Sequence, residues 1–163
     1  MNIKIKKHFL LYKGYKLKCN VGKSGISSSK KEGDFTTPKG IFKLGLLYYR
    51  KDRIKSLKCK IKKKVIKKNM GWCDDSRSNK YNKEINFPFK YKAERLYRKD
   101  KIYDVLINIK YNYRPVLKKR GSAIFLHINN GKYKPTKGCI SVSKKDFFRI
   151  LPLIKKDTKI SIN

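Results

Sequence analysis

The sequence has few residues that bind metals and no long apolar run. Of its 163 residues only 2 are His and 4 are Cys, and no two cysteines form a C-x-x-C pair, so the spacing excludes a zinc ribbon and a thioredoxin-like motif. Two imidazoles are too few for a His-rich metal site. No apolar stretch approaches the length that crosses a bilayer. We therefore expect no metal, no cofactor and no membrane-spanning helix.

Acidic residues are also scarce, because 11 Asp and Glu face 45 Lys and Arg and leave a net charge of +34. Such a charge draws a protein toward polyanions. Three explanations compete: nucleic-acid binding, attraction to an anionic cell-wall polymer or lipid, and a compositional bias that places Lys at tolerant surface positions. The excess is almost all Lys and is spread along the chain, while Arg is sparse. We favour the bias, expect no nucleic-acid partner, and keep an anionic wall or membrane surface as a possible partner.

Signals for export and for disulfides are weak as well. Near the basic N-terminus the only unbroken apolar run is Phe9–Tyr12, which is too short for a signal-peptide core. The protein then stays in the cytoplasm, is exported by another route, or begins further upstream, and the sequence does not decide between these. Four cysteines would permit two disulfides in an oxidising compartment. We expect Cys19, Cys59 and Cys73 to behave as small buried apolar residues.

The remaining residues indicate one mainly β domain that spans residues 1–163. The apolar content of 39% is enough for a globular core. Alternation of apolar and polar residues, typical of half-buried strands, occurs in four stretches: 3–5, 15–21, 57–61 and 160–162. Longer apolar runs are expected to be inner strands buried on both faces, and there are three of them: 41–49, 103–109 and 122–128.

Helix is indicated at only two places. Ser143 is a suitable N-cap with Asp146 three residues on, and Pro152 should end or bend the helix that follows. The stretch "AERLYRKD", residues 93–100, is expected to form one or two turns. The prediction is therefore a mainly β fold with one or two short helices, built as a β-sandwich or a partly closed barrel.

The stretch "HINNGKYKPTKGCIS", residues 127–141, contains both a histidine and a cysteine. A thiol is a nucleophile only as thiolate, so it needs a base and a path to solvent. Gly138 permits a tight turn that presents Cys139 with backbone N–H groups aimed at one point, and Thr136 can hydrogen-bond across that turn. His127 lies at the end of an apolar run, where a buried strand would place its imidazole at a rim of the fold. The residues alone leave open that Cys139 is a buried strand thiol and His127 a satisfied strand end.

Taken together, these residues resemble the L,D-transpeptidase catalytic domain (YkuD-like) family, in particular a proteobacterial branch of it. The family signature is a His followed after a loop by [S/T]-x-G-C and a β-branched residue, here His127 and Thr136–Ile140. The likeness extends to "KKEGDFTTPKGIFKL", "GWCDD", "YN" at Tyr81 and Asn82, "YDVLINIKYN" and "GSAIFLHI". It covers most of the chain, from about Val21 to the last strand.

The resemblance implies a β-rich cysteine acyltransferase that acts on peptidoglycan stem peptides. Cys139 would attack a peptide carbonyl beside an L centre and release the downstream residue. An amine, typically of a diaminopimelate side chain in a neighbouring stem, would then take the thioester and complete a cross-link. His127 would carry the proton from the thiol to the leaving amine. The family orients this His with a backbone carbonyl, so no third catalytic side chain is implied, and its members imply a periplasmic location.

Departures from the family pattern bear on substrate binding more than on acyl transfer. Eleven residues separate His127 from Cys139, so the loop that frames the substrate channel is short. Lys137 stands where His is common, and Ser141 stands where Arg or Asn is common. We expect these two residues, together with Thr136, to contact the substrate.

Four further residues are candidates for substrate binding. Tyr111 and Asn112 end the "YDVLINIKYN" segment. Asp74 and Asp75 would either bind a substrate ammonium or cap a turn. Two alternatives to a transpeptidase stay open: a peptidase or amidase that resolves the thioester with water, and a basic nucleic-acid-binding module with an incidental thiol. The donor and acceptor positions and the oligomeric state are not indicated.

Overall fold

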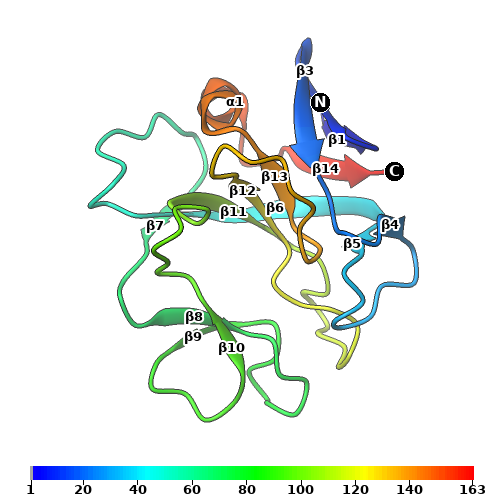
Figure 1. The fold of residues 1–163 in the computed structure, drawn as a ribbon, viewed down its shortest axis with the longest axis vertical. Helices are drawn as coiled ribbons and strands as arrows, with labels where there is room; N and C mark the ends of the chain where they lie inside the picture. Colours follow the sequence, from blue (N-terminus) through cyan, green and yellow to red (C-terminus); the bar gives the residue numbers. More distant parts are fainter. Residues whose placement is uncertain (1) are drawn as a thin grey trace.

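The computed structural model describes residues 2–163 and places fourteen strands, one α-helix and one 3-10 helix in that part of the chain (Figure 1). The strands are β1 (Ile3–Lys6), β2 (Phe9–Tyr12), β3 (Tyr15–Asn20), β4 (Ile26–Ser27), β5 (Thr37–Pro38), β6 (Gly40–Tyr49), β7 (Lys63–Val65), β8 (Met70–Cys73), β9 (Glu84–Asn86), β10 (Ala93–Arg95), β11 (Val105–Ile109), β12 (Phe125–Ile128), β13 (Ile140–Val142) and β14 (Lys159–Ile162). The helical segments are α1 (Lys144–Ile150) and η1 (Leu151–Leu153).

Eight strands form a closed barrel, so the mainly β prediction is confirmed and the barrel is fully rather than partly closed. The strand order around it is β11–β12–β13–β3–β2–β1–β14–β6, and β6 pairs back with β11. The length of β6, 10 residues, makes this closure possible. Its first half pairs with β14, and its second half pairs with β11 on one side and β7 on the other.

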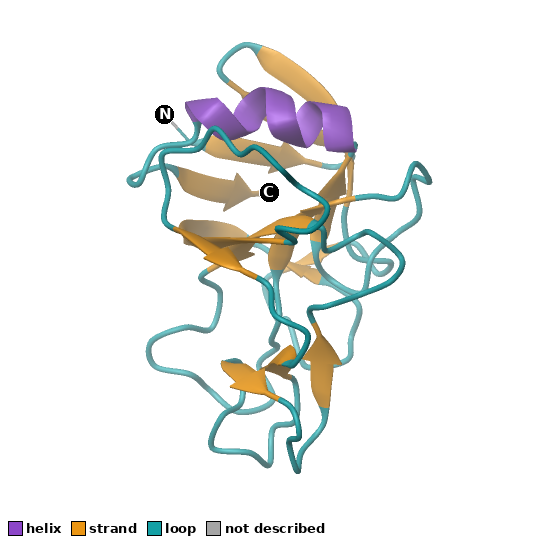
Figure 2. Ribbon diagram, turned by 90° about the vertical axis from the view of Figure 1, so that its left-hand side faces the viewer, coloured by secondary structure: helices purple, strands orange, loops and turns teal. Residues whose placement is uncertain are grey.

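Alternate residues of the barrel strands fill its interior. In β1, Ile3 and Ile5 are fully buried while the lysines between and after them are exposed, which is the two-residue period of a half-buried strand. Phe147 and Ile150 of α1 are buried in the same core. Figure 2 shows the helix on the side of the barrel away from the small sheet. The barrel interior is therefore mainly apolar, which favours its outer face or a rim as the place for polar chemistry.

The predicted helix begins and ends as its sequence indicates. The Asp146 N–H donates to the Ser143 hydroxyl at 3.0 Å, which satisfies one of the free N–H groups of the first turn. The α-helix stops at Ile150, and the segment with Pro152 continues as the 3-10 turn η1. None of the helices in the described part of the chain has the length and apolar character needed to cross a bilayer.

A second, smaller sheet lies over one wall of the barrel. Its strand order is β10–β8–β9, and both of its pairs are antiparallel. An aromatic cluster fills the space between it and the barrel: Trp72 of β8 packs edge to face on Tyr48 of β6 at 6.3 Å and on Phe125 of β12 at 5.3 Å between ring centroids. Cys139 belongs to this cluster. The small sheet thus forms a roof over the wall that carries the candidate nucleophile.

The predicted helical turns at residues 93–100 are wrong. Residues 93–95 form β10, with Ala93 opposite Cys73 and Arg95 opposite Gly71 on β8. The next residue, Leu96, is fully buried in the aromatic cluster. Pairing and burial here outweigh the helix propensity of the segment, which is only a weak preference.

Two strand predictions are also wrong. Residues 57–61 alternate in polarity but form no strand, because pairing with β6 starts only at Lys63. The run 41–49 is a strand but is not buried on both faces, since Ile41 is 63% exposed. The roof reaches β6 only in its second half, around Tyr48, so the outer face of the first half meets solvent.

All four cysteines are free thiols in the structure. Cys19 and Cys73 are buried, as expected for small apolar residues, while Cys59 is only partly buried. Burial raises the pKa of the Cys19 thiol to about 12, so that thiol is unreactive at neutral pH.

Candidate active site

Two adjacent strands place Cys139 and His127 on the same outer face of the barrel. β12 and β13 are parallel, with His127 opposite Ser141. Because side chains alternate between the two faces of a sheet, Cys139, two residues before Ser141, points to the same side as His127. The Cys139 Sγ accepts a hydrogen bond from the Phe125 N–H at 3.4 Å and donates to the Ala123 carbonyl at 3.2 Å. Both candidate residues therefore face the roof.

The turn that precedes Cys139 is held from both sides. The Thr136 hydroxyl donates to the Cys139 carbonyl at 2.6 Å and accepts from the Gly138 N–H at 3.1 Å, as expected for a residue that spans the turn. From a distant segment, the buried Thr37 hydroxyl donates to the Gly138 carbonyl and accepts from the Gly22 N–H, each at 2.8 Å. This network fixes the position of Cys139. It also engages the Gly138 N–H, so this group is hydrogen-bonded within the turn.

Gly138 is required at its position by backbone shape and by crowding. Its φ of +135° is one that L side chains rarely adopt, and an added Cβ would lie 2.8 Å from the Thr36 carbonyl oxygen. We expect Gly138→Ala to lower the free energy of unfolding by about 1–3 kcal/mol and to slow acylation of Cys139 by at least about tenfold, measured by thermal melting and intact-mass kinetics.

Gly131→Ala is the matched control for this prediction. Gly131 lies in the same loop and also has a positive φ, +87°, but an added Cβ would meet no atom within 4 Å. It should cost stability without slowing acylation. Equal acylation rates for wild type and Gly138→Ala would contradict the assigned role of the turn.

His127 is held as a neutral imidazole by a backbone carbonyl. Its Nδ1 lies 2.8 Å from the Ile128 carbonyl oxygen, so Nδ1 carries the proton and donates, and Nε2 is left as the base. Burial, assisted by the charge of Arg98, lowers the pKa of His127 to about 4. The ring of Tyr103 packs edge to face on the imidazole at 5.3 Å. A backbone carbonyl thus orients this histidine.

The Cys139 thiol is protonated and shielded in the free protein. The residue is 8% exposed. Burial, followed by the negative charge of Glu94, raises the pKa of Cys139 to about 12, against smaller lowering effects from the Phe125 N–H, the Tyr103 hydroxyl and the Lys30 ammonium. Two surface cavities, of about 550 and 500 Å³, are lined by neither Cys139 nor His127. Little of Cys139 is therefore open to solvent in this structure.

The expected substrate residues next to the nucleophile differ in exposure. Lys137 is exposed, beside the turn, where a substrate can reach it. Ser141 is 1% exposed and accepts a 3.4 Å hydrogen bond from the Asn20 side chain. It lies on the same outer face as His127 but is fully covered, so its burial does not favour a direct contact with substrate.

The other four candidates hold loops. The Tyr111 hydroxyl donates to the Arg120 carbonyl, and the Asn112 side chain bonds to both the N–H and the carbonyl of Leu117. Asp75 accepts hydrogen bonds from the backbone and the side chain of Arg77, which agrees with the turn-capping alternative. Asp74 forms an ion pair with Lys92 at 3.5 Å.

Sequence reasoning missed three residues that border the thiol: Tyr103, Glu94 and Lys30. The Tyr103 hydroxyl donates to Glu94 Oε1 at 2.9 Å, and the buried Lys30 ammonium forms a 2.9 Å ion pair with Asp34. Lys30 and Asp34 lie in the quoted "KKEGDFTTPKG" segment, so the family likeness was the one available signal for them. Among residues 2–163, no group of three or more His, Cys, Asp and Glu side chains is arranged to hold a metal ion.

Comparisons with known proteins bear on the family of the chain. Residues 3–162 match the profile of the L,D-transpeptidase catalytic domain, YkuD. A solved structure of Bd1075 from Bdellovibrio bacteriovorus aligns with a TM-score of 0.49 and 15% identity, over 99% of this chain and 47% of that one. The chain thus spans about half the length of Bd1075, and no curated protein sequence matches it. Because the profile covers essentially the whole sequence, the chain belongs to the L,D-transpeptidase catalytic domain family.

Proposed function

We propose that the chain is a peptidoglycan L,D-transpeptidase with Cys139 as its nucleophile and His127 as its base. The observation that supports this most is the register of β12 and β13, which puts the two side chains on one face of the barrel at the end of a braced turn. The hydrogen bond from His127 Nδ1 to a backbone carbonyl adds to it, because this bond leaves Nε2 free to accept a proton.

In the first half of the reaction a stem peptide acylates the sulfur. The thiol proton of Cys139 passes to Nε2 of His127, and the sulfur attacks a peptide carbonyl beside an L centre. Main-chain N–H groups near Cys139 would stabilise the tetrahedral oxyanion. The C–N bond then breaks, the departing amine takes the proton from the imidazolium, and a thioester remains on the enzyme.

In the second half an amine of a neighbouring stem attacks the thioester carbonyl. Nε2 of His127 takes a proton from that amine, the C–S bond breaks, and the Cys139 sulfur is reprotonated by the imidazolium. The product is a new amide cross-link and the original enzyme. Water in place of the amine would give hydrolysis through the same intermediate.

The experiment that tests this function is incubation of purified muropeptides with the enzyme, followed by separation and mass analysis of the products. We expect wild type to release the terminal residue and to form cross-linked dimers, and Cys139→Ala to do neither. Release without dimers would identify a peptidase. An unchanged profile with folded wild-type protein would contradict any action on these peptides.

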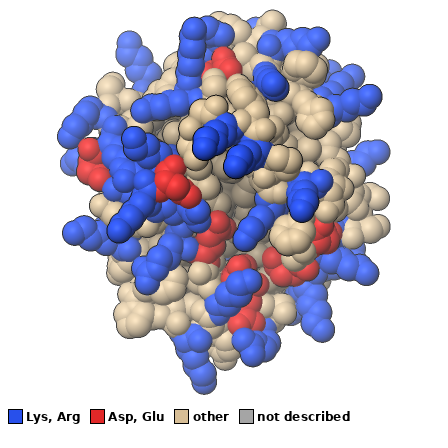
Figure 3. Space-filling view, in the orientation of Figure 1, with Lys and Arg blue, Asp and Glu red and all other residues tan. Residues whose placement is uncertain are grey.

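We also propose that the enzyme works in the periplasm, against an anionic wall or membrane surface. Members of this family typically act there, and the net charge of +34 favours attachment to anionic polymers. Figure 3 shows Lys and Arg spread over the whole visible face rather than gathered in one patch. Such a distribution fits loose, salt-sensitive retention better than one shaped anion site.

A further inference from the structure

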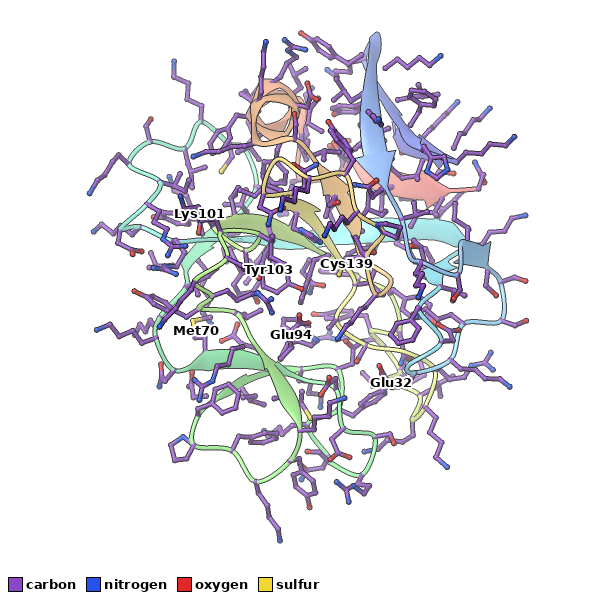
Figure 4. All side chains as sticks on the ribbon, viewed as in Figure 1. Glu32, Met70, Glu94, Lys101, Tyr103 and Cys139 are labelled. Atoms are coloured by element: carbon purple, nitrogen blue, oxygen red, sulfur yellow. The ribbon has the colours of Figure 1, made fainter. Side chains whose placement is uncertain are left out.

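A carboxylate lies beside the candidate nucleophile and has no role in the proposed reaction. Glu94 is on β10 of the roof, and the Tyr103 hydroxyl donates to its Oε1 at 2.9 Å. Tyr103 in turn packs on His127 and can hydrogen-bond to the Cys139 sulfur. Figure 4 shows Glu94, Tyr103 and Cys139 gathered between the barrel and the small sheet.

The charges that face Glu94 do not fully compensate it. The nearest cation, Arg98, has its Nη1 3.6 Å from Oε1, but its Nε donates to Asp100 at 3.0 Å. Asp74 adds a second negative charge nearby, and Lys137 a more distant positive one. Burial raises the pKa of Glu94, so the carboxylate is less stable here than in water. A cation placed against it would therefore gain more than it would on an open surface.

A second glutamate on the same small sheet has a closer cation than Glu94 has. Glu84 on β9 accepts a 2.9 Å hydrogen bond from the Tyr48 hydroxyl, much as Glu94 does from Tyr103. Glu84 also forms a 2.7 Å ion pair with Lys64. The Glu94 side chain is 30% exposed, so solvent or a ligand can reach it.

We propose that Glu94 recognises an ammonium group of the substrate beside Cys139, and that this ammonium, by neutralising the Glu94 charge, helps to activate the thiol. The inference rests on the proposed function for the identity of the substrate, a stem peptide that carries a free side-chain amine. In a chain of net charge +34, a carboxylate next to the thiol is what would distinguish a cationic ligand from an anionic one.

The link between ammonium binding and activation of the thiol follows from the sign of each charge interaction. The negative charge of Glu94 raises the pKa of Cys139, so removal or neutralisation of that charge lowers it. At a pH below the thiol pKa, each unit by which that pKa falls increases the thiolate fraction tenfold. A substrate ammonium would thus bind to Glu94 and activate the Cys139 thiol in one step. The free enzyme would keep its sulfur protonated and protected from oxidation, because the thiolate is the form that is oxidised.

The first test measures alkylation of Cys139 by iodoacetamide as a function of pH, by peptide mass mapping. Glu94→Gln keeps an acceptor for Tyr103 but removes the charge, and it should alkylate roughly 3- to 10-fold faster than wild type at pH 7. Tyr103→Phe removes a donor that stabilises the thiolate, so it should not be faster. Glu84→Gln, the matched control, should behave as wild type.

Two outcomes of this test would overturn the inference. An unchanged rate in Glu94→Gln would mean that its charge does not act on the sulfur. Acceleration in both Glu94→Gln and Tyr103→Phe would mean that either change merely loosens the roof. This test needs no stem peptide, so its result stands whether or not the proposed function is correct.

The second test compares two tetrapeptide stems, one with a free diaminopimelate side-chain amine and one with that amine acetylated. The readout is release of the terminal residue in a single turnover. Wild type should prefer the free amine by at least about tenfold in single-turnover rate, and Glu94→Gln should lose that preference. A preference that survives in Glu94→Gln would overturn the inference, whereas release from neither peptide by wild type would contradict the proposed function instead.

Discussion

Alanine in place of Cys139 should abolish covalent labelling by a carbapenem, an acylating agent expected to react with members of this family. The reason is that this thiol alone, among the four in the chain, shares a barrel face with His127. We expect wild type to gain the mass of one adduct in intact-mass spectrometry and Cys139→Ala to gain none. The labelling rate should fall by at least roughly a thousandfold, since the variant lacks the sulfur on which the acyl bond forms.

Cys59→Ala is the control for this experiment. Cys59 is the most exposed of the other three thiols, so it is the one most open to unspecific labelling. Its Sγ donates to the Ile61 carbonyl in a loop, away from the roof. Cys59→Ala should acquire the adduct at the wild-type rate. Equal labelling of wild type and Cys139→Ala would place the nucleophile elsewhere.

The barrel could be predicted strand by strand, but its closure could not. Alternation in β1 and β14 reports a buried inner face, and each of these strands was predicted from its own residues. Closure depends on β6 and β11, whose pairing joins Leu47 to Ile107 across 60 positions of sequence. Both are apolar runs that do not carry the identity of their partner, so the sequence leaves a sandwich and a barrel equally open.

The roof was the part of the fold that sequence reasoning missed. Its strand β10 has only three residues, of which Ala93 and Glu94 are good helix formers, so no two-residue period was visible. Pairing with β8 and burial of Leu96 decide its conformation. Because the segment was read as helix, the carboxylate it brings to Cys139 was also missed, and Asp74 and Asp75 were the only acidic candidates considered.

The identities of the two central site residues were readable, but their electrostatic state was not. The spacing of His127 and Cys139 within one motif marked both residues, and Gly138 and Thr136 marked the turn. The burial that protonates the thiol and deprotonates the imidazole comes from Tyr103 and the roof, which lie far from the motif in sequence. The motif gives the proposed reacting residues, and the roof gives their resting charges.

Glutamine in place of His127 should slow carbapenem acylation by roughly 10²- to 10⁴-fold at pH 7, the usual contribution of a general base. In wild type the imidazole has a pKa of about 4, so it stays neutral and able to accept the thiol proton at every pH above that value. The wild-type rate should fall only as the pH drops through about 4. The variant instead depends on spontaneous ionisation of a thiol whose pKa is about 12.

The two pH profiles should therefore converge at high pH. Between pH 6 and 10 the His127→Gln rate should rise about tenfold per unit, because the thiolate fraction does, and the defect should shrink toward alkaline pH. His8→Gln is the matched control, since His8 is exposed in the turn between β1 and β2. A His127→Gln rate within about threefold of wild type at pH 7 would show that His127 is not the general base. A defect that stays constant with pH would indicate that His127 positions the substrate rather than carries the proton.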